Sequence, residues 1–155
     1  MDNFTFGVRL AFDIGKVRIG VAACDGFGIL SSPVVTLMRQ DSTLGQQLKD
    51  LRLEYEPIEL FIGLPINLQG RTTASTQDAI EFARNLKAIF QIPTFLIDER
   101  LSTVSASNAL RSAGIDSKSS KKIIDQQAAC VILDTALGNL KQGITSGIEI
   151  EEYAK

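Results

Sequence analysis

The spacing of the apolar residues changes at about residue 43, and this change limits the possible fold more than any other feature of the chain. In residues 17–23, Val, Ile, Val and Ala alternate with Arg, Gly and Ala, which is the pattern of a strand with one buried face. In residues 43–55, leucines and a tyrosine recur every three or four positions, as on one face of a helix. A strand meander followed by alternating helices and strands predicts a mixed α/β sheet.

Nine segments of the chain have the pattern of a strand or a helix. We expect strands at residues 8–14, 17–23, 29–38, 59–63 and 94–98, and helices at 43–55, 76–90, 103–113 and 121–140. Pro33 cannot donate to a sheet ladder, so the third strand should lie at an edge. Right-handed crossovers then place the later strands beside the first, in the order 3-2-1-4-5. We therefore predict a ribonuclease-H-like mixed five-stranded sheet of the α/β class, with helices on both faces.

A chain of 155 residues without repeats or a proline-rich linker has the length of one domain. We assign residues 1–142 to this domain and residues 143–155 to an acidic, flexible tail. The longest stretch without charge, residues 26–38, has thirteen residues, which is too short to cross a bilayer. Charged residues near the N-terminus exclude a signal-peptide core, so we expect no membrane partner and a cytoplasmic location.

The composition removes several kinds of catalytic chemistry. The chain has no histidine, which excludes serine and cysteine triads and histidine-based zinc sites. Its two cysteines, Cys24 and Cys130, are too few for a zinc cage, and we expect both to be small buried side chains. Polar chemistry must therefore rest on carboxylates, lysine, tyrosine or hydroxyls, and carboxylate oxygens favour Mg²⁺ or Mn²⁺.

Four acidic residues occupy positions where such chemistry is expected. Asp13 closes the first strand, Asp98 and Glu99 close the last one, and Asp125 lies in the apolar final helix. The carboxyl ends of strands collect functional groups in open α/β sheets. Because side chains alternate along a strand, only one of Asp98 and Glu99 can face Asp13.

Each of these acids also has a structural interpretation. Asp13 could shape a turn, Asp98 or Glu99 could cap the next helix, and Asp125 could compensate a helix dipole. Taken together, however, three acids converging on one sheet edge in a chain without histidine favour a metal site. A pair of divalent ions can hydrolyse a phosphodiester without any histidine.

Four segments resemble the YqgF/RuvX family, described as pre-16S rRNA nucleases and Holliday-junction-resolvase-like proteins. The resemblance extends from about Leu10 to Leu140, with the segments in the expected order and spacing. The segments are DIGKVRIGVA at 13–22, GLPIN at 63–67 with Gly70, DERLSTV at 98–104, and the helix 122–133.

The resemblance implies a ribonuclease-H-like nuclease that depends on a divalent metal, Mg²⁺ or Mn²⁺. Its substrate would be RNA in the maturation of the 5′ end of 16S rRNA, a step of ribosome biogenesis. By position, the resemblance implies that the catalytic residues and metal ligands are Asp13, Glu99 and Asp125. The family pattern selects Glu99 over Asp98, whereas the strand pattern leaves this choice open. Two departures are Val17, where the family often has a basic residue, and Gln126-Gln127, which leaves a fourth metal ligand open.

The net charge of −2 does not by itself point to nucleic acid, but cations lie next to each acid in the sequence. Ordinary surface charge is the alternative explanation for the three lysines that precede Asp125 in a serine-rich segment, which we expect to be a loop. We expect residues 71–76 to form a polar lip over the site, and four phenylalanines (27, 61, 82 and 95) to lie in the core. The expected contacts to nucleic-acid phosphates are Lys16, Arg18, Arg71, Arg100, Lys118, Lys121 and Lys122.

Several alternatives stay open at this point. The partner could be precursor rRNA or another structured nucleic acid, and the protein could instead cut branched DNA at Holliday junctions. It could also bind RNA in ribosome assembly without cutting it, and a homodimer is compatible with the sequence. A nucleotide-dependent phosphotransferase shares the Asp-x-Gly hairpin but needs two lobes, and this chain has the length of one.

Overall fold

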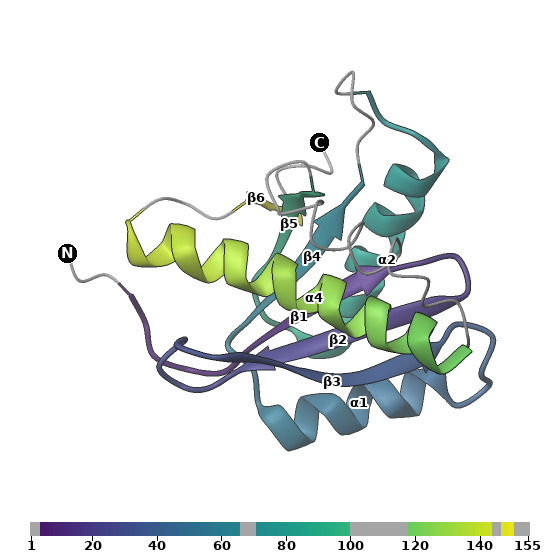
Figure 1. Cartoon of the computed structure of the whole chain (residues 1–155), viewed down its shortest axis with the longest axis horizontal. Helices are drawn as coiled ribbons and strands as arrows, with labels where there is room; N and C mark the ends of the chain where they lie inside the picture. Colours follow the sequence, from purple (N-terminus) through teal and green to yellow (C-terminus); the bar gives the residue numbers. More distant parts are fainter. Residues whose placement is uncertain (1–3, 66–70, 100–117, 144–146, 151–155) are drawn as a thin grey trace.

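A six-stranded mixed sheet forms the centre of the computed structural model, which describes residues 4–65, 71–99, 118–143 and 147–150 (Figure 1). The strand order is β3-β2-β1-β4-β5-β6. The order of the first five strands and the edge position of the strand with Pro33 are as predicted. The elements are β1 (Arg9–Ile14), β2 (Arg18–Cys24), β3 (Ser31–Met38), α1 (Leu44–Tyr55), β4 (Glu59–Leu64), α2 (Ala74–Phe90), β5 (Thr94–Asp98), α4 (Lys118–Lys141) and β6 (Ile148–Glu149).

The sixth strand comes from the segment expected to be a loose tail. β6 pairs antiparallel with β5, and Ile150 after it is 2% exposed. Gly147 has φ of +80° and lies so close to the carbonyl oxygen of Leu96 that no side chain would fit there. The strand thus depends on one glycine and on two paired residues, and a segment this short shows no alternating pattern in the sequence.

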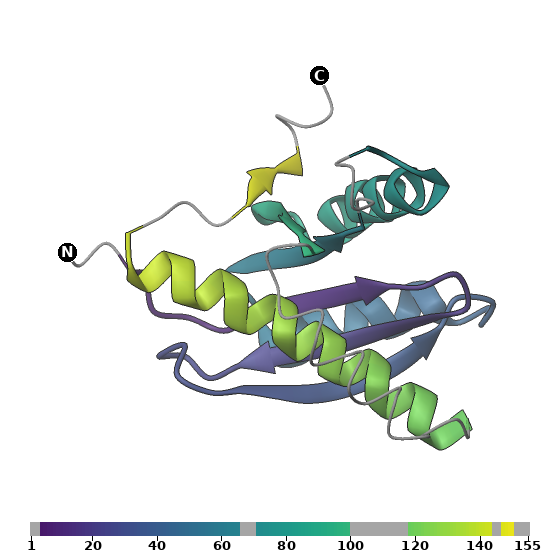
Figure 2. The same cartoon turned by 45° about the horizontal axis from the view of Figure 1, so that its top comes forward.

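Helices cover both faces of the sheet, as predicted (Figure 2). α4 crosses one face, where its apolar residues pack on Ala11, Ala22 and Phe61. α1 and α2 cover the opposite face, where Leu10, Phe12 and their neighbours form a second cluster. Adjacent residues of β1 belong to different clusters because side chains alternate across a strand. This alternation decides which acids can meet under α4.

α2 begins earlier than the sequence predicted, and its start replaces the expected polar lip at residues 74–76. Thr73 is the N-cap, and its hydroxyl accepts a hydrogen bond from the backbone N–H of Thr76. The Thr76 side chain in turn accepts from the backbone N–H of Thr73, and its hydroxyl donates to the carbonyl of Pro65. This reciprocal cap fixes the first turn of α2.

The expected core residues are mostly buried. Cys24 of β2 and Cys130 of α4 are free, buried thiols in the cluster between the sheet and α4, and burial raises the pKa of both. Phe61 and Phe82 are buried and Phe95 is half-buried, but Phe27 is 64% exposed and the expectation for it was wrong. Phe27 lies in a loop whose backbone N–H groups bind the Asp25 carboxylate, so the turn, not the core, sets its position.

The helices within the described ranges are all too short or too polar to span a membrane. The helix expected at residues 103–113 lies outside the described residues.

Candidate active site

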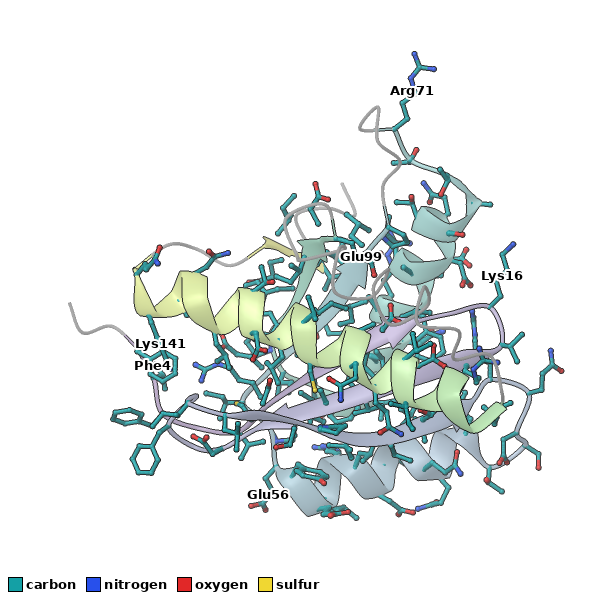
Figure 3. The ribbon with its side chains drawn as sticks, in the orientation of Figure 1. Phe4, Lys16, Glu56, Arg71, Glu99 and Lys141 are labelled. Carbon is teal, nitrogen blue, oxygen red and sulfur yellow. The ribbon has the colours of Figure 1, made fainter. Side chains whose placement is uncertain are left out.

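The side chains of Asp13 and Glu99 belong to the same face of the sheet. Ala11, two residues before Asp13, is buried under α4, and so is Ile97, two residues before Glu99. β1, β4 and β5 are parallel, so their carboxyl ends lie at the same edge. Figure 3 shows Glu99 beside the middle of α4. The two strand ends thus present their acids on the face that α4 covers.

Glu99 lies over Gly63 of β4, the strand between β5 and β1. A Cβ atom on Gly63 would be 2.6 Å from Glu99 Oε1 and 2.6 Å from Ile132 Cδ1. The register of β1 and β4 pairs Phe12 with Ile62, so Asp13 and Gly63 are the next residues along the two strands. The Glu99 carboxylate therefore lies over the neighbour of Asp13, where only glycine leaves room for it.

Asp125 is held against the strand on the other side of Asp13. The register of β1 and β2 pairs Asp13 with Gly20. A Cβ atom on Gly20 would overlap the backbone oxygen of Asp125 on α4. Helix and strand approach this closely because Gly20 has no side chain. Asp13 consequently has a glycine beside it in both neighbouring strands, one beneath Glu99 and the other beneath Asp125.

The carboxylate of Asp125 is engaged by Arg18. Arg18 Nε lies 2.7 Å from Asp125 Oδ2, and the two side chains are 28% and 18% exposed. Arg18 is two residues before Gly20 in β2, so it lies on the same face of the sheet. The next residue of α4, Gln126, donates through Nε2 to the Thr36 hydroxyl of β3 at 3.1 Å. Both contacts fix the position of α4 on the meander.

Asp98 belongs to the opposite face. It pairs with Leu64 in the register of β4 and β5, and Leu64 and Leu96 both lie in the cluster under α1 and α2. Alternation along β5 therefore places Glu99, and not Asp98, on the face of Asp13 and Asp125. Glu99 is also the residue that the family resemblance selects, and its catalytic role stays a prediction.

The three acids share a face without forming a ligand cluster. Among the described residues, no group of three or more Asp, Glu or Cys side chains is close enough to hold a metal ion. One oxygen of Asp125 is bound to Arg18 instead. Their assignment as catalytic residues and metal ligands stays a prediction, supported by the shared face.

The basic residues predicted to contact phosphates are distributed unevenly. Lys16 is exposed in the β1–β2 turn, Arg18 is committed to Asp125, and the exposed Arg71 points away from the sheet (Figure 3). Arg100 lies outside the described residues. Three lysines lie in the first turns of α4, not in a loop, and their side chains are outside the described part: Lys118, Lys121 and Lys122.

Arg39 and Asp78 were missed by the sequence analysis. Arg39 Nη1 and Nη2 donate to the two carboxylate oxygens of Asp78 at 2.6 and 3.0 Å, and Nη1 also donates to the carbonyl oxygen of Gly15 at 2.9 Å. These hydrogen bonds lower the pKa of Asp78 and raise that of Arg39. The pair joins the end of β3, α2 and the turn after Asp13. No local sequence signal marks it, because its members are 39 residues apart.

The strand order and the helix α4 on one face define the structural class, an α/β domain with a ribonuclease-H-like fold. The fold is similar to that of T. thermophilus RuvC in complex with a Holliday junction substrate, with a TM-score of 0.60 and 9% identity over 90% of this chain and 98% of that chain. At this identity the similarity bears on the fold alone.

The chain belongs to the RuvX family, described as Holliday junction resolvase, whose pattern matches residues 7–139. A relative from Clavibacter michiganensis named "putative pre-16S rRNA nuclease" is 48% identical over 84% of this chain and 83% of its own length. A relative of the same name from Streptomyces coelicolor is 45% identical over 84% of this chain and 80% of its own length. The resemblance found in the sequence is thereby confirmed. Membership makes the protein a nuclease, a hydrolase of phosphodiester bonds.

Proposed function

We propose that this protein hydrolyses phosphodiester bonds of precursor 16S rRNA in the maturation of its 5′ end. The observation that carries the proposal is the pair of glycines beside Asp13. Gly20 admits the backbone of Asp125, and Gly63 admits the carboxylate of Glu99. The choice of RNA over other nucleic acids rests on the name shared by relatives that are 45% and 48% identical.

The donor set fits a divalent cation, Mg²⁺ or Mn²⁺. Asp13, Glu99 and Asp125 offer only carboxylate oxygens, the ligands that hard cations prefer. Such an ion, when bound, lowers the pKa of a coordinated water and neutralises charge on the leaving oxygen. Because Arg18 is paired with one oxygen of Asp125, this carboxylate can offer its other oxygen to an ion, and both oxygens only if the ion displaces the guanidinium.

The chain's own residues have distinct roles in this proposal. Asp13 is fixed by the pairing of β1 with both neighbours, and Glu99 is held over Gly63. Arg18 orients Asp125 and compensates its charge on a partly buried face. The cations proposed to hold the substrate backbone are Lys16, Arg71, Arg100, Lys118, Lys121 and Lys122, and Arg18 joins them only when Asp125 releases its guanidinium.

The proposal is tested with a 16S rRNA transcript that carries an extended 5′ end, incubated with purified protein and Mg²⁺ or Mn²⁺. The wild type should cut it, and Asp13→Asn and Glu99→Gln should each lower the rate by about 100-fold or more. Asp98→Asn is the matched control, because it neutralises the adjacent acid on the opposite face. Equal activity in Asp13→Asn, or an equal loss in Asp98→Asn, would overturn the assignment.

A four-way DNA junction is the second candidate substrate, favoured by the description of the family as Holliday junction resolvase. Incubation of the same protein with a labelled junction and with the rRNA transcript decides between them. A protein that binds the transcript but cuts neither substrate with either metal would be a non-catalytic assembly factor.

We further propose that the domain assigned to residues 1–142 extends through β6, which pairs with β5, and that it acts as one unit in the cytoplasm, where rRNA is processed. A homodimer stays a prediction, tested by light scattering of the purified protein.

A further inference from the structure

A cavity of about 490 Å³ opens beside the turn that follows Asp13. Its volume is in the range of sites for small ligands, ~300–1,000 Å³. Three separate segments meet there: the β1–β2 turn, the end of β3 and the first turn of α2. The lining residues are Lys16, Arg39, Gln40, Ala74, Ser75 and Asp78.

The charges on the wall favour an anion. Lys16 and Arg39 are cationic, and among the described residues of the lining the one acid, Asp78, is bound through both oxygens to Arg39. Arg39 also lies over the Phe82 ring, with its Cζ atom 5.2 Å from the ring centroid, so several contacts fix its guanidinium. Since the positive charge of Arg39 balances the negative charge of Asp78, the described lining has one net positive charge, that of Lys16. Neutral donors are present in the Ser75 hydroxyl and the Gln40 amide.

The cavity lies at the same end of the sheet as the acids. Lys16 is three residues after Asp13, and Arg39 binds the carbonyl oxygen of Gly15 between them. Figure 3 shows Lys16 extending from the β1–β2 turn beside α2. A nucleic-acid strand with one phosphate at Asp13 and Glu99 would cross this turn within a few nucleotides.

We infer that this cavity is a phosphate subsite, which binds a backbone phosphate of the substrate strand a few nucleotides from the bond that is cut. The inference rests on the proposed function for the identity of the strand. Lys16, Arg39, Gln40 and Ser75 hold the phosphate and thereby set the register of the strand without reading its bases. A free phosphate or a mononucleotide presents the same chemistry, so the test must separate these ligands from the strand.

Ser75→Asp tests the subsite. The new carboxylate repels a phosphate in the cavity, whereas at the start of a helix an acid is stabilising, so the fold is retained. Gln77→Glu is the matched control, because it adds the same charge to an exposed position in the next part of α2 that does not line the cavity. Thermal unfolding followed by circular dichroism verifies that both variants fold.

Binding is measured by fluorescence anisotropy of a labelled rRNA-precursor fragment without divalent metal, over a series of KCl concentrations. We expect Ser75→Asp to weaken binding about tenfold and to reduce the salt slope by about 0.7, the value of one lost phosphate contact on a single strand. Gln77→Glu should stay within about twofold of the wild type. Unchanged binding in Ser75→Asp, or equal losses in both variants, would overturn the subsite.

Calorimetric titration with inorganic phosphate and with adenosine monophosphate distinguishes the other ligands. Saturable binding of either one that Ser75→Asp abolishes, together with unchanged RNA binding, would assign the cavity to a free anion and overturn the inference. Because RNA binding is measured without cleavage, the two proposals fail separately. Loss of affinity in Ser75→Asp, without any cleavage of the transcript by the wild type, would retain the subsite and overturn the proposed cleavage of precursor 16S rRNA.

Discussion

Gly20 and Gly63 are as important to the site as the acids themselves. Each lies beside Asp13 in a neighbouring strand, and each leaves the space that another part of the site fills. The atoms above them differ, however. Above Gly63 lie two side-chain ends, those of Glu99 and Ile132, whereas above Gly20 lies the backbone of α4. Side chains can rotate away from an added methyl group, but a helix backbone moves only as a unit.

Gly63→Ala should impair cleavage more than stability. The added Cβ displaces the carboxylate of Glu99 and forces Ile132 to repack, so we expect a loss of about 1–3 kcal/mol in the free energy of unfolding and a rate at least about tenfold lower. Chemical denaturation and the rRNA cleavage assay measure the two effects. Gly138→Ala in α4 is the control: nothing lies within 4 Å of the new atom, and alanine favours the helix. Wild-type cleavage by Gly63→Ala would contradict the position assigned to Glu99.

Arg18→Met tests the contact between Arg18 and Asp125. Removal of the guanidinium frees the Asp125 carboxylate for a cation, and methionine keeps most of the apolar stem. We expect Mn²⁺ to bind up to about fivefold more tightly, since a partly exposed ion pair contributes up to ~1 kcal/mol. Isothermal titration calorimetry measures the affinity without any substrate. Weaker Mn²⁺ binding would show that Arg18 supports the metal site instead of competing for it.

At the scale of elements, α4 is the part that completes the site. Its position depends on the contact over Gly20, the Arg18–Asp125 ion pair and the hydrogen bond between Gln126 and Thr36. The helix itself is predictable from apolar spacing, and so are the five principal strands. Its placement is not, because Arg18 and Asp125 are 107 residues apart and pair only after the sheet has formed.

In the candidate site, too, the local pattern could be predicted from the sequence, but the placement of the elements could not. Strand alternation in the sequence shows that Asp98 and Glu99 face opposite sides, but not which side α4 covers. The sequence did not predict β6, because a strand of two residues is too short to show an alternating pattern. It did not predict the early start of α2, because the capping box there consists of Thr73 and Thr76 and lacks the usual glutamate.

Gly20→Ala should displace α4. The methyl group would overlap the backbone oxygen of Asp125, so the helix must shift as a whole. We expect a greater loss of stability than for Gly63→Ala, about 3 kcal/mol or more, with weaker protection of the α4 amides in hydrogen exchange. Unchanged stability and exchange would mean that α4 does not lie on Gly20.

The Arg39–Asp78 ion pair joins α2 to the β1–β2 turn and should make stability depend on pH. The hydrogen bonds from Arg39 hold the pKa of Asp78 below its unfolded value of about 3.9. The stabilisation is therefore fully present above about pH 4 and is lost as the pH falls through the folded pKa. Thermal unfolding between pH 6 and about pH 2.5 should show the wild type losing its advantage over Asp78→Asn at the acid end. A constant difference over this range would contradict the pair.

For the whole molecule, one end of the sheet carries the chemistry. The carboxyl ends of β1, β4 and β5, the β1–β2 turn and the Arg39–Asp78 pair all lie there. Phe27, in the loop after β2, is at the opposite end. The topology explains why these groups share one end of the sheet. β4 and β5 run parallel to β1, so they end where β1 ends, and that is the end at which the β1–β2 hairpin turns.

The position of a bound Mn²⁺ ion tests the central claim most directly. Crystals of the full chain grown with MnCl₂ should show an anomalous-scattering peak on the α4 face, within coordination distance of Asp13 and Glu99, with Asp125 turned toward the ion. The peak should be absent from crystals of Asp13→Asn prepared in the same way. A manganese peak away from these carboxylates, or none at saturating metal, would contradict the account.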